Sequence, residues 1–355
     1  MTTTPTRPVE LAANQPPQFY RGGRSIAALR RASVNERFGP EDWVASTTAR
    51  FGTADSGLSR LPDGQLLRSA IESDPVSWLG AEHVAQFGAD PALLVKLLDA
   101  GQRLPVHCHP SNDFAQRHFA SHFGKTEAWV VIGTDGPDPT VYAGFREAVD
   151  AETAANWVSA QNSAAMLSAL NPIPVSVGDC VLIPAGLPHA IGAGVFVVEL
   201  QQPTDFSITL EWDGFLDTAE HGHLGIGFPT ALRALDRSAW SPDRLASLVT
   251  RRPDGDLRSR CPLPPAAAPF FRAEMLAPTS SVTLTEAFSV LVGLSGAGVL
   301  RTANGEACDV HQGSTFVLPH AAGAVTLSGE LTALRALPPA PVPADDNQRG
   351  TGRNG

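Results

Sequence analysis

The chain has 355 residues, of which 43% are hydrophobic and 17% are charged, and this is the composition of an ordinary globular protein. It excludes collagen, long coiled coils and wholesale disorder. Twenty-six basic residues against 36 acidic ones give a net charge of −10. This charge is a poor match to a polyanion, so we expect neither nucleic acid nor an anionic membrane surface as a partner.

The sequence also lacks the usual signs of a membrane or secreted protein. No apolar run approaches the roughly 20 residues that a membrane helix needs, and the first residues lack the apolar stretch of a secretory signal. Four cysteines, at positions 108, 180, 261 and 308, form no CxxC pair and are too sparse for a disulfide scaffold. We therefore expect a cytoplasmic protein.

The predicted elements are mostly strands. Thirty prolines and 32 glycines separate short β-rich runs, which favours many strands joined by turns. Helical patterns occur over residues 70–98, 150–170 and 229–249, and Asp150 is a plausible N-cap for the second. Strands are expected over residues 127–132, 180–183, 195–199, 207–212, 289–294, 315–318 and 331–336.

A weak internal repeat predicts two related halves. Residues 175–191 and 308–325 share a strand, a glycine turn, an apolar strand, a proline and then a histidine, which is His320 in the second copy. A stretch rich in Pro, Ala and Arg, residues 251–269, is typical of a linker. The expected domains are disordered tails at 1–18 and 339–355, a metal-binding barrel with a helical insertion at 19–215, a helix and linker at 216–268, and a second barrel without metal at 269–338.

The strongest chemical signal is the segment LPVHCHPSND at 104–113. His107 and His109 are two residues apart, so on a strand both imidazoles point to the same face. Cys108 then points to the opposite face and is expected to be a small core residue. A lone His-x-His is more often a coincidence than a metal site, so the pair needs partners elsewhere.

Two further residues supply these partners. Glu127 lies in an otherwise apolar strand, where an unpaired carboxylate would be costly to bury. His189 follows a turn made by Pro184, Gly186 and Pro188. Three imidazoles and one carboxylate suit a borderline divalent ion such as zinc, with positions left open to water or substrate. We therefore predict one divalent metal ion, with zinc as the favoured identity.

The order of these segments resembles class I mannose-6-phosphate isomerase of the cupin superfamily, in its short bacterial form. The resemblance covers about residues 19–338 and implies a mainly β fold of two cupin-like, jelly-roll β-barrels with a helical insertion and linker helices. The motifs that carry it are RGGRSIAALR, EDWVAS, LLVKLLDAG, HCHPSND, FGKTEAWVVI, VYAGF, PAGLPHAIG with ELQQPTD, and PFFRAEM.

The resemblance also implies residue roles. In that family the metal is held by Gln, His, Glu and His, and His107 stands here in place of the glutamine, a departure that should tighten metal binding. The implied activity interconverts mannose 6-phosphate and fructose 6-phosphate through an enediol, which needs a base and an electrophile. The candidates for the base are Lys125 and Glu199. The non-catalytic alternatives are that Lys125 only forms a salt bridge and that Glu199 is a buried structural carboxylate. Substrate contacts are expected from Ser111, Lys125, Gln201 and Thr209.

One departure bears on the substrate. Thr209 stands where the family has an arginine of the active site, and residues 147–232 contain no Lys or Arg. A phosphate usually meets Arg, Lys or a helix N-terminus, so any cation must come from elsewhere. The possibilities considered are Lys96, Lys125, Arg21, Arg24, Arg103, Arg117, Arg146, Arg272 and Arg301.

Three other hypotheses remain open. An isomerase of the same mechanism acting on another or unphosphorylated sugar would explain Thr209. A sugar-binding cupin without catalysis would keep the metal and lose the arginine. An iron dioxygenase would use the same ligand types. A second His-x-His, His221 and His223, has no acidic or histidine partner at ligand spacing and is not expected to bind a second metal.

Overall fold

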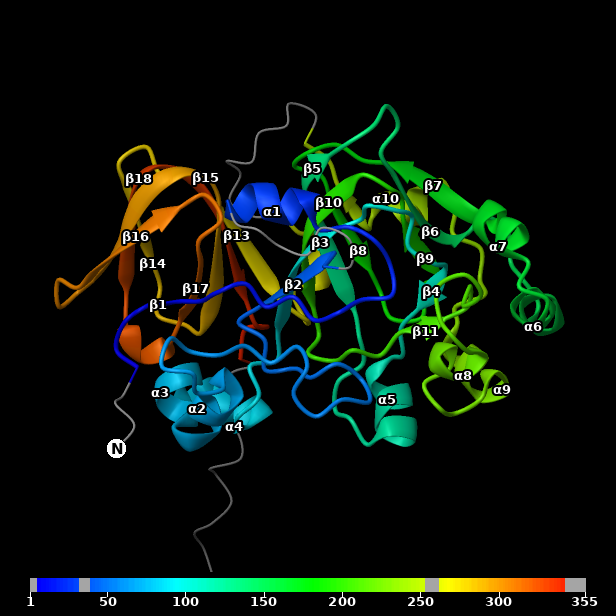
Figure 1. Ribbon diagram of the computed structural model, residues 1–355, viewed down its shortest axis with the longest axis horizontal. Helices are drawn as coiled ribbons and strands as arrows, with labels where there is room; N and C mark the ends of the chain where they lie inside the picture. The colour runs from blue at the N-terminus through cyan, green and yellow to red at the C-terminus, as the bar shows by residue number, and fades with distance from the viewer. Residues whose placement is uncertain (1–4, 32–38, 253–261, 342–355) are drawn as a thin grey trace, which may run out of the picture.

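The computed structural model describes residues 5–31, 39–252 and 262–341. These residues form three sheets in which paired strands run antiparallel, together with short helices (Figure 1). The predicted mainly β fold is confirmed. The closure of these sheets into two barrels stays a prediction.

One sheet is built from the C-terminal strands and the N-terminal strand, and it lies on the left in Figure 1. Its path runs β1-β17-β15-β18-β13, with β14 paired to β18 and β16 paired to β15. The strands are β1 (Val9–Glu10), β13 (Arg272–Leu276), β14 (Ser281–Leu284), β15 (Ser289–Thr302), β16 (Ala307–His311), β17 (Thr315–Leu318) and β18 (Val325–Leu337).

The other two sheets come from the middle of the chain. The six-stranded sheet has the order β12-β8-β5-β10-β3-β2, and the five-stranded sheet has the order β11-β4-β9-β6-β7. The strands are β2 (Glu41–Val44), β3 (Leu94–Asp99), β4 (His107–Cys108), β5 (Glu127–Thr134), β6 (Thr140–Phe145), β7 (Leu170–Pro174), β8 (Cys180–Ile183), β9 (His189–Ile191), β10 (Val195–Gln201), β11 (Ile208–Thr209) and β12 (Val249–Thr250).

Short helices surround the sheets. In the described part of the chain, α2, α3 and α4 gather in one group and α6 and α7 in another (Figure 1). The helices are α1 (Arg24–Arg30), α2 (Leu67–Ser73), α3 (Pro75–Leu79), α4 (Ala81–Phe87), α5 (Asn112–Phe119), α6 (Ala151–Ser159), α7 (Ser163–Ala169), α8 (Ala219–Gly222), α9 (Phe228–Ala231), η1 (Leu232–Ala234), α10 (Pro242–Ala246), η2 (Pro265–Ala267) and η3 (His320–Ala322).

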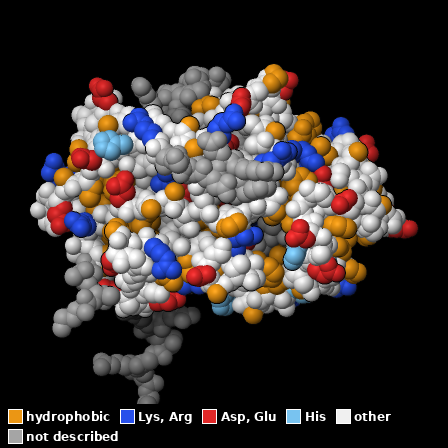
Figure 2. All heavy atoms as spheres, viewed as in Figure 1, with side chains coloured by type: hydrophobic (Ala, Val, Ile, Leu, Met, Phe, Trp, Pro, Cys, Tyr) orange, Lys and Arg blue, Asp and Glu red, His pale blue; other side chains and the backbone are white. Residues whose placement is uncertain are grey.

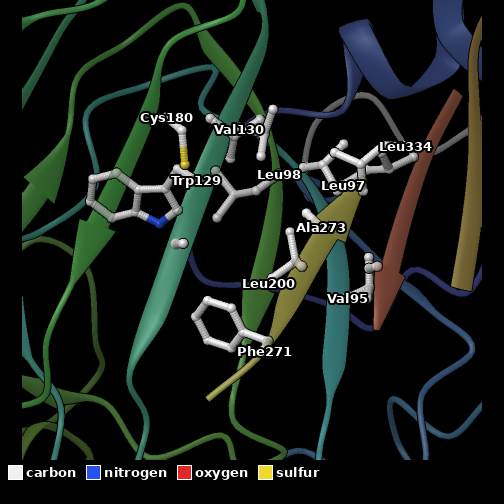
Figure 3. Close-up of a cluster of buried hydrophobic side chains, with 14 of the residues drawn as sticks. Val95, Leu97, Leu98, Trp129, Val130, Cys180, Leu200, Phe271, Ala273 and Leu334 are labelled. Carbon is white, nitrogen blue, oxygen red and sulfur yellow. The ribbon is translucent and has the colours of Figure 1, made fainter. Parts of the chain in front are cut away.

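The six-stranded sheet separates an apolar core from a polar face. Successive side chains of a strand point to opposite faces, so Val95 and Leu97 share one face of β3 while Lys96 takes the other. The apolar face packs against β13 and β18 in one hydrophobic cluster. Figure 3 shows Leu97 close to Leu334 and Ala273, with Trp129 on the other side of β5. The opposite face is therefore available for polar side chains.

The helix predicted over residues 70–98 is wrong in its second half. Helices α2, α3 and α4 occupy the first part, but LVKLLD forms β3, between β10 and β2. All six residues of β3 are buried. A strand that is apolar on one face and buried on both cannot be told from a helix by its periodicity, and this explains the error.

Two other predicted helices are broken. Gln161, with φ of 49°, separates α6 from α7, while the predicted cap is confirmed because Asp150 Oδ1 accepts the Thr153 N–H at 2.7 Å. Between α9 and α10, Ala239 forms a bridge with Phe145 instead of continuing a helix. The strand predicted over residues 207–212 is shorter than expected, since β11 has two residues.

The N-terminal segment is ordered where the structure describes it. Val9 and Glu10 pair with β17, Leu11 is buried, and the Asn14 side chain donates to Trp43 O at 3.0 Å and to Gly57 O at 2.8 Å. The disordered tail predicted over 1–18 is therefore wrong for residues 5–18, because the edge of β17 provides a pairing partner. Residues 1–4, the middle of the predicted linker (253–261) and most of the predicted C-terminal tail (342–355) lie outside the described residues.

Charges of both signs are mixed over the face shown in Figure 2, and no patch of a single sign gathers there. That face therefore offers no concentrated field for steering a polyanion. Within the described ranges, no helix combines the length and the apolar character needed to cross a membrane.

Candidate metal centre

Three histidines and one glutamate meet between the five-stranded and six-stranded sheets. His107 on β4 is paired with His189 on β9, and His109 follows on the same side of the chain as His107. Glu127 is the first residue of β5 in the six-stranded sheet. All four residues are buried, and one ligand atom from each lies within 4.8 Å of the others. The structure thus brings together the four predicted ligands.

Each imidazole is held by its Nδ1 atom. His107 Nδ1 lies 2.8 Å from Pro105 O, His109 Nδ1 lies 2.8 Å from Phe206 O, and His189 Nδ1 lies 2.8 Å from Leu187 O. A carbonyl can only accept, so these contacts assign the proton to Nδ1 and leave the Nε2 lone pair free. This backbone support is the usual way of orienting histidines that bind metals.

The atoms facing one another fit a divalent cation. Glu127 Oε2 and His189 Nε2 are buried and make no hydrogen bond to any residue that the structure describes. The Lys125 ammonium lies 3.2 Å from Glu127 Oε2 and 3.3 Å from His109 Nε2, so the cluster already attracts positive charge. Nitrogen and carboxylate donors in this number are the ligand types of zinc and related ions.

The protonation states also favour metal binding. Burial, and then the neighbouring histidines, hold the pKa of His107 well below its usual value, and burial together with Lys125 lowers the pKa of His109 to about 3. Burial alone would raise the pKa of Glu127, but Lys125 and His109 outweigh it and hold the pKa well below the usual value. Near neutral pH His107 and His109 are therefore neutral imidazoles and Glu127 is an ionised carboxylate, which are the forms that bind a metal.

A polar row crosses the same face of the six-stranded sheet. Glu199 on β10 is opposite both Trp129 on β5 and Lys96 on β3, and Lys96 is opposite Trp43 on β2. The Trp129 indole N–H lies 3.1 Å from Glu127 Oε1 and 3.2 Å from Glu199 Oε1. Cross-strand register thus connects the metal cluster to a second buried carboxylate.

The pKa of the second carboxylate, Glu199, is shifted in the opposite direction to that of Glu127. Burial, and then the negative charge of Glu127, raises the pKa of Glu199 to about 7. Its Oε2 atom makes no hydrogen bond to a described residue, and the Lys96 ammonium is 3.7 Å away. Lys96 itself keeps its proton, because Glu41 at 3.2 Å and Glu199 raise its pKa against the effect of burial. A carboxyl group of this kind can exchange a proton near neutral pH.

A pocket of about 690 Å³ opens onto this cluster, and we call it the metal pocket. Its lining includes His107, Glu127, Lys125, Glu199 and Thr209. Three of the five residues predicted to be catalytic or to bind substrate, Lys125, Glu199 and Thr209, therefore lie together with the ligands. The other two predicted contacts do not.

Ser111 and Gln201 lie outside the pocket lining. Ser111 is exposed at the start of α5, where its Oγ accepts the Phe114 N–H at 3.2 Å. The Gln201 side chain is buried opposite Glu127 and donates to Gln202 O at 3.1 Å and to Thr204 O at 2.6 Å. Both side chains have structural partners, and their contact with substrate stays a prediction.

Thr209 stands beside the metal cluster. It is paired with His107 across β11 and β4, and its side chain is buried in the pocket wall. Among the described residues lining this pocket the cations are Lys96, Lys125 and Arg50. None of the seven arginines considered from the sequence belongs to the lining, whereas Arg50 was missed because no motif marks its loop.

The remaining residues singled out in the sequence have other surroundings. Cys108 is buried in the hydrophobic cluster behind β4, as predicted, and burial raises the pKa of its thiol to about 12. His221 lies at the pocket wall and His223 accepts the Gly227 N–H at 3.1 Å. His320 begins η3, against Gly80.

Curated proteins of similar sequence carry one name. The chain is 37% identical over 135 residues to a mannose-6-phosphate isomerase of Streptococcus mutans, which covers 37% of this chain and 41% of that protein. It is 32% identical over 193 residues to mannose-6-phosphate isomerase ManA of Bacillus subtilis, which covers 53% of this chain and 56% of that protein. The chain thus spans about half the length of the curated relatives it matches. No protein-family model matches the chain.

Solved structures share the fold. The mannose 6-phosphate isomerase of Bacillus subtilis superposes with a TM-score of 0.70 at 20% identity, over 93% of this chain and 99% of that one. A mannose 6-phosphate isomerase bound with zinc and yttrium gives 0.69 at 15% identity, over 94% and 100%. The resemblance predicted from the motifs is confirmed, and the chain has the fold of these isomerases.

Proposed function

We propose that the protein is a metal-dependent aldose–ketose isomerase that interconverts mannose 6-phosphate and fructose 6-phosphate. The observation that carries this proposal is the convergence of four metal-ligand side chains with Lys125 and Glu199 in one pocket. The curated relatives named mannose-6-phosphate isomerase support the same activity. We further propose a cytoplasmic location, a sugar phosphate as the ligand, and no nucleic-acid or membrane partner.

His107, His109, Glu127 and His189 would hold a single divalent ion. Zinc is the proposed identity, because three imidazoles and a carboxylate suit it and because one structure of the same fold is described with zinc. When bound, the ion supplies positive charge that stabilises the oxyanion developing on the sugar.

The chain's own residues would move the protons. Isomerisation transfers a proton between two adjacent carbons, so one group must take it and return it on the same face of the enediol. Glu199 suits this role because it lines the pocket and its Oε2 has no hydrogen-bond partner among the described residues. Lys125, which lines the same pocket, would exchange the proton of the sugar hydroxyl.

The first test measures isomerisation of fructose 6-phosphate by the zinc-loaded protein beside free fructose and mannose. We expect turnover of the phosphosugar that a chelator abolishes and zinc restores. Turnover that survives complete metal removal would contradict the metal assignment. Absence of turnover with every sugar would reject the isomerase.

The second test separates catalysis from metal binding. Glu199→Gln keeps the size of the side chain and removes the proton acceptor, so kcat should fall about 100- to 10,000-fold. Its zinc content should stay at the wild-type value, since Glu199 is not a proposed ligand. Glu82→Gln, at an exposed position on α4, is the matched control and should keep wild-type kcat. An active Glu199→Gln protein would return the role of base to Lys125.

A second candidate is an isomerase of the same mechanism that acts on an unphosphorylated sugar. Two observations favour it. Thr209 is neutral beside His107, and the described lining carries more carboxylates than cations, with Asp217 and Glu220 among the former. Turnover of a free sugar without turnover of its phosphate would establish this candidate.

A further inference from the structure

Arg50 lies in the wall between two pockets. The metal pocket and an adjoining pocket of about 580 Å³ share three lining residues, Arg50, Phe51 and Asp205. A ligand that extends from the metal pocket toward this wall therefore meets Arg50. No sequence motif marks Arg50, so only the fold brings it to the site.

Hydrogen bonds hold the backbone around Arg50, whereas its guanidinium has no partner among the described residues. The Arg50 N–H donates to Ser56 O at 2.7 Å, the Phe51 N–H donates to Asp205 Oδ2 at 3.0 Å, and the Thr53 hydroxyl donates to Arg50 O at 2.9 Å. The guanidinium makes no hydrogen bond or ion pair with any residue in the described ranges. A rigid loop thus presents a cation whose five donors are free for a ligand.

The other cations of the metal pocket are already engaged. The Lys96 ammonium is 3.2 Å from Glu41 and 3.7 Å from Glu199. The Lys125 ammonium is 3.2 Å from Glu127 and 3.3 Å from His109. Within the described lining, Arg50 is therefore the cation left to neutralise an anionic group on a ligand.

The adjoining pocket provides more unused donors. Arg68 donates from Nε to Thr47 O at 2.6 Å, and its two Nη groups make no hydrogen bond within the part of the chain that the structure describes. Thr48 lines this pocket and is only 7% exposed, yet its Oγ1 has no hydrogen-bond partner among the described residues. A buried hydroxyl left without a partner costs free energy that a polar ligand atom can recover.

Three carboxylates line the adjoining pocket, Glu72, Asp90 and Asp205, and Asp90 is close enough to Arg68 to feel its charge. Asp205 accepts the Phe51 N–H and Asp90 accepts the Ala92 N–H at 2.7 Å, while burial raises the pKa of both. Neither forms an ion pair with Arg50. An anion would therefore be bound by the Arg50 guanidinium, the two Nη groups of Arg68 and the buried Thr48 hydroxyl rather than by an excess of positive charge.

We propose that the wall between the two pockets is a subsite for a phosphate monoester, with Arg50 as its principal cation and with Arg68 and Thr48 behind it. This proposal rests on the proposed function. The subsite would bind the phosphate of the sugar phosphate, while the carbonyl end of the same sugar lies at the metal cluster. Arg50 would thereby supply the positive charge that the resembled family has at the position of Thr209. Bidentate binding of phosphate oxygens is what a guanidinium does best.

The test compares R50Q with R60Q in zinc-loaded protein. Arg60 is exposed, lines neither pocket and donates to Gly64 O at 2.9 Å, so R60Q is a matched control from the same region. We measure kcat/KM for fructose 6-phosphate and for fructose, and the rise in melting temperature with inorganic phosphate. R50Q should lower the ratio of the two kcat/KM values about 10- to 100-fold, mainly through KM, because a charged hydrogen bond is lost. It should also remove the phosphate-induced stabilisation, and R60Q should change neither quantity.

The outcomes separate this subsite from the proposed function. If the wild-type protein turns over the phosphosugar and R50Q keeps the wild-type ratio, the subsite is wrong and the isomerase stands. If the wild-type protein turns over no phosphosugar, the rise in melting temperature with inorganic phosphate still tests the subsite. An R50Q protein with the same rise as the wild type would then reject the subsite. Phosphate inhibition that R50Q removes but that does not compete with fructose 6-phosphate would assign Arg50 to a separate anion and overturn its role in substrate binding.

Discussion

At the scale of residues, the metal cluster follows from three backbone carbonyls as much as from its ligands. Pro105, Phe206 and Leu187 each accept from the Nδ1 of one histidine, and this turns every Nε2 toward Glu127. Because the carbonyls belong to ordered backbone, the ring orientations do not depend on a bound ion. The cluster is thus arranged before a metal arrives, which favours affinity.

His109→Ala should abolish stoichiometric zinc binding and leave the fold intact. The side chain lies between the sheets at one end of β4, apart from the large hydrophobic cluster, so its loss removes a ligand without opening that core. Zinc content after dialysis and far-UV circular dichroism check the two parts. His107→Gln, which restores the ligand type of the resembled family, should bind zinc more weakly than wild type and more tightly than His109→Ala, since an amide oxygen is a poorer ligand than an imidazole.

The control for this series is His118→Gln, an exposed histidine on α5. It should keep wild-type zinc content and affinity. A His109→Ala protein that retains one tightly bound zinc would remove His109 from the ligand set, whatever its activity.

The sequence predicted residues of the site where spacing alone decides geometry. His107 and His109 had to share a face, and Glu127 in an apolar strand needed a compensating partner. Gln201 and Ser111 could not be placed in this way, because their side chains bond to nearby backbone groups that no motif reveals. Arg50 escaped for the opposite reason, since its role depends on where a loop meets Asp205 in the folded chain.

At the scale of elements, β3 shows why local pattern misled. LVKLLD has the apolar content of a buried helix, and its polar residue, Lys96, is explained only by the pairing with Glu199 and Trp43 on neighbouring strands. The strands with clear alternation or turn signals, such as β8 and β17, were predicted with their observed bounds. A strand such as β3, which is defined by its pairing with the strands on both sides, could not be predicted from its own residues alone.

Helix α4 is expected to make the stability of the protein depend on pH. His83 is 4% exposed, its Nε2 lies 2.7 Å from Asp90 O, and its ring is 4.9 Å from that of Phe87. Burial lowers the pKa of His83 below 6.5. Between the folded and unfolded pKa values the unfolded chain binds more protons, so the free energy of unfolding rises with pH in this window. The contribution is complete above about pH 6.5 and is lost as the pH falls toward the folded value.

His83→Gln keeps a hydrogen-bond donor and removes the titration. Urea unfolding between pH 5 and pH 7.5 should therefore show a shallower loss of stability on acidification in the variant than in the wild type. His122→Gln, at an exposed position outside α4, should follow the wild-type curve. Parallel curves for His83→Gln and wild type would mean that His83 titrates normally in the folded protein.

At the scale of the whole molecule, the three sheets share one large hydrophobic cluster, while two smaller clusters belong to the five-stranded and seven-stranded sheets separately. The cluster that covers β3, β5 and β10 continues into β13, β15 and β18. Arg30 on α1 adds a polar connection, because it donates to Asp42 at 2.7 Å and to Thr315 Oγ1 at 3.0 Å on β17. The repeat seen in the sequence predicted two similar halves, but their mutual packing depends on side chains far apart in the chain and was not predictable.

Gly80→Ala should report on a second contact between these parts. Gly80 lies between α3 and α4 with φ of 89° and ψ of 149°, and a Cβ there would be 2.4 Å from His320 Cδ2 at η3. Backbone strain of about 1–3 kcal/mol and overpacking of about 1–3 kcal/mol should both lower the free energy of unfolding in urea. Gly64 has the same φ of 89° with open space around a Cβ, so Gly64→Ala isolates the strain.

A double-mutant cycle then isolates the contact itself. His320→Ala alone should lower the free energy of unfolding slightly, because some packing is lost. In the double variant it also removes the side chain that the new Cβ of Gly80→Ala would clash with. The double variant should therefore lose less stability than the sum of the two single variants, which is a coupling energy of opposite sign to the single effects. The residual cost should match that of Gly64→Ala. If Gly80→Ala costs no more than Gly64→Ala, or if His320→Ala restores nothing, then His320 does not fix α3 against the seven-stranded sheet. In that case the shared hydrophobic cluster, Arg30 and the pairing of β1 with β17 would hold the parts together.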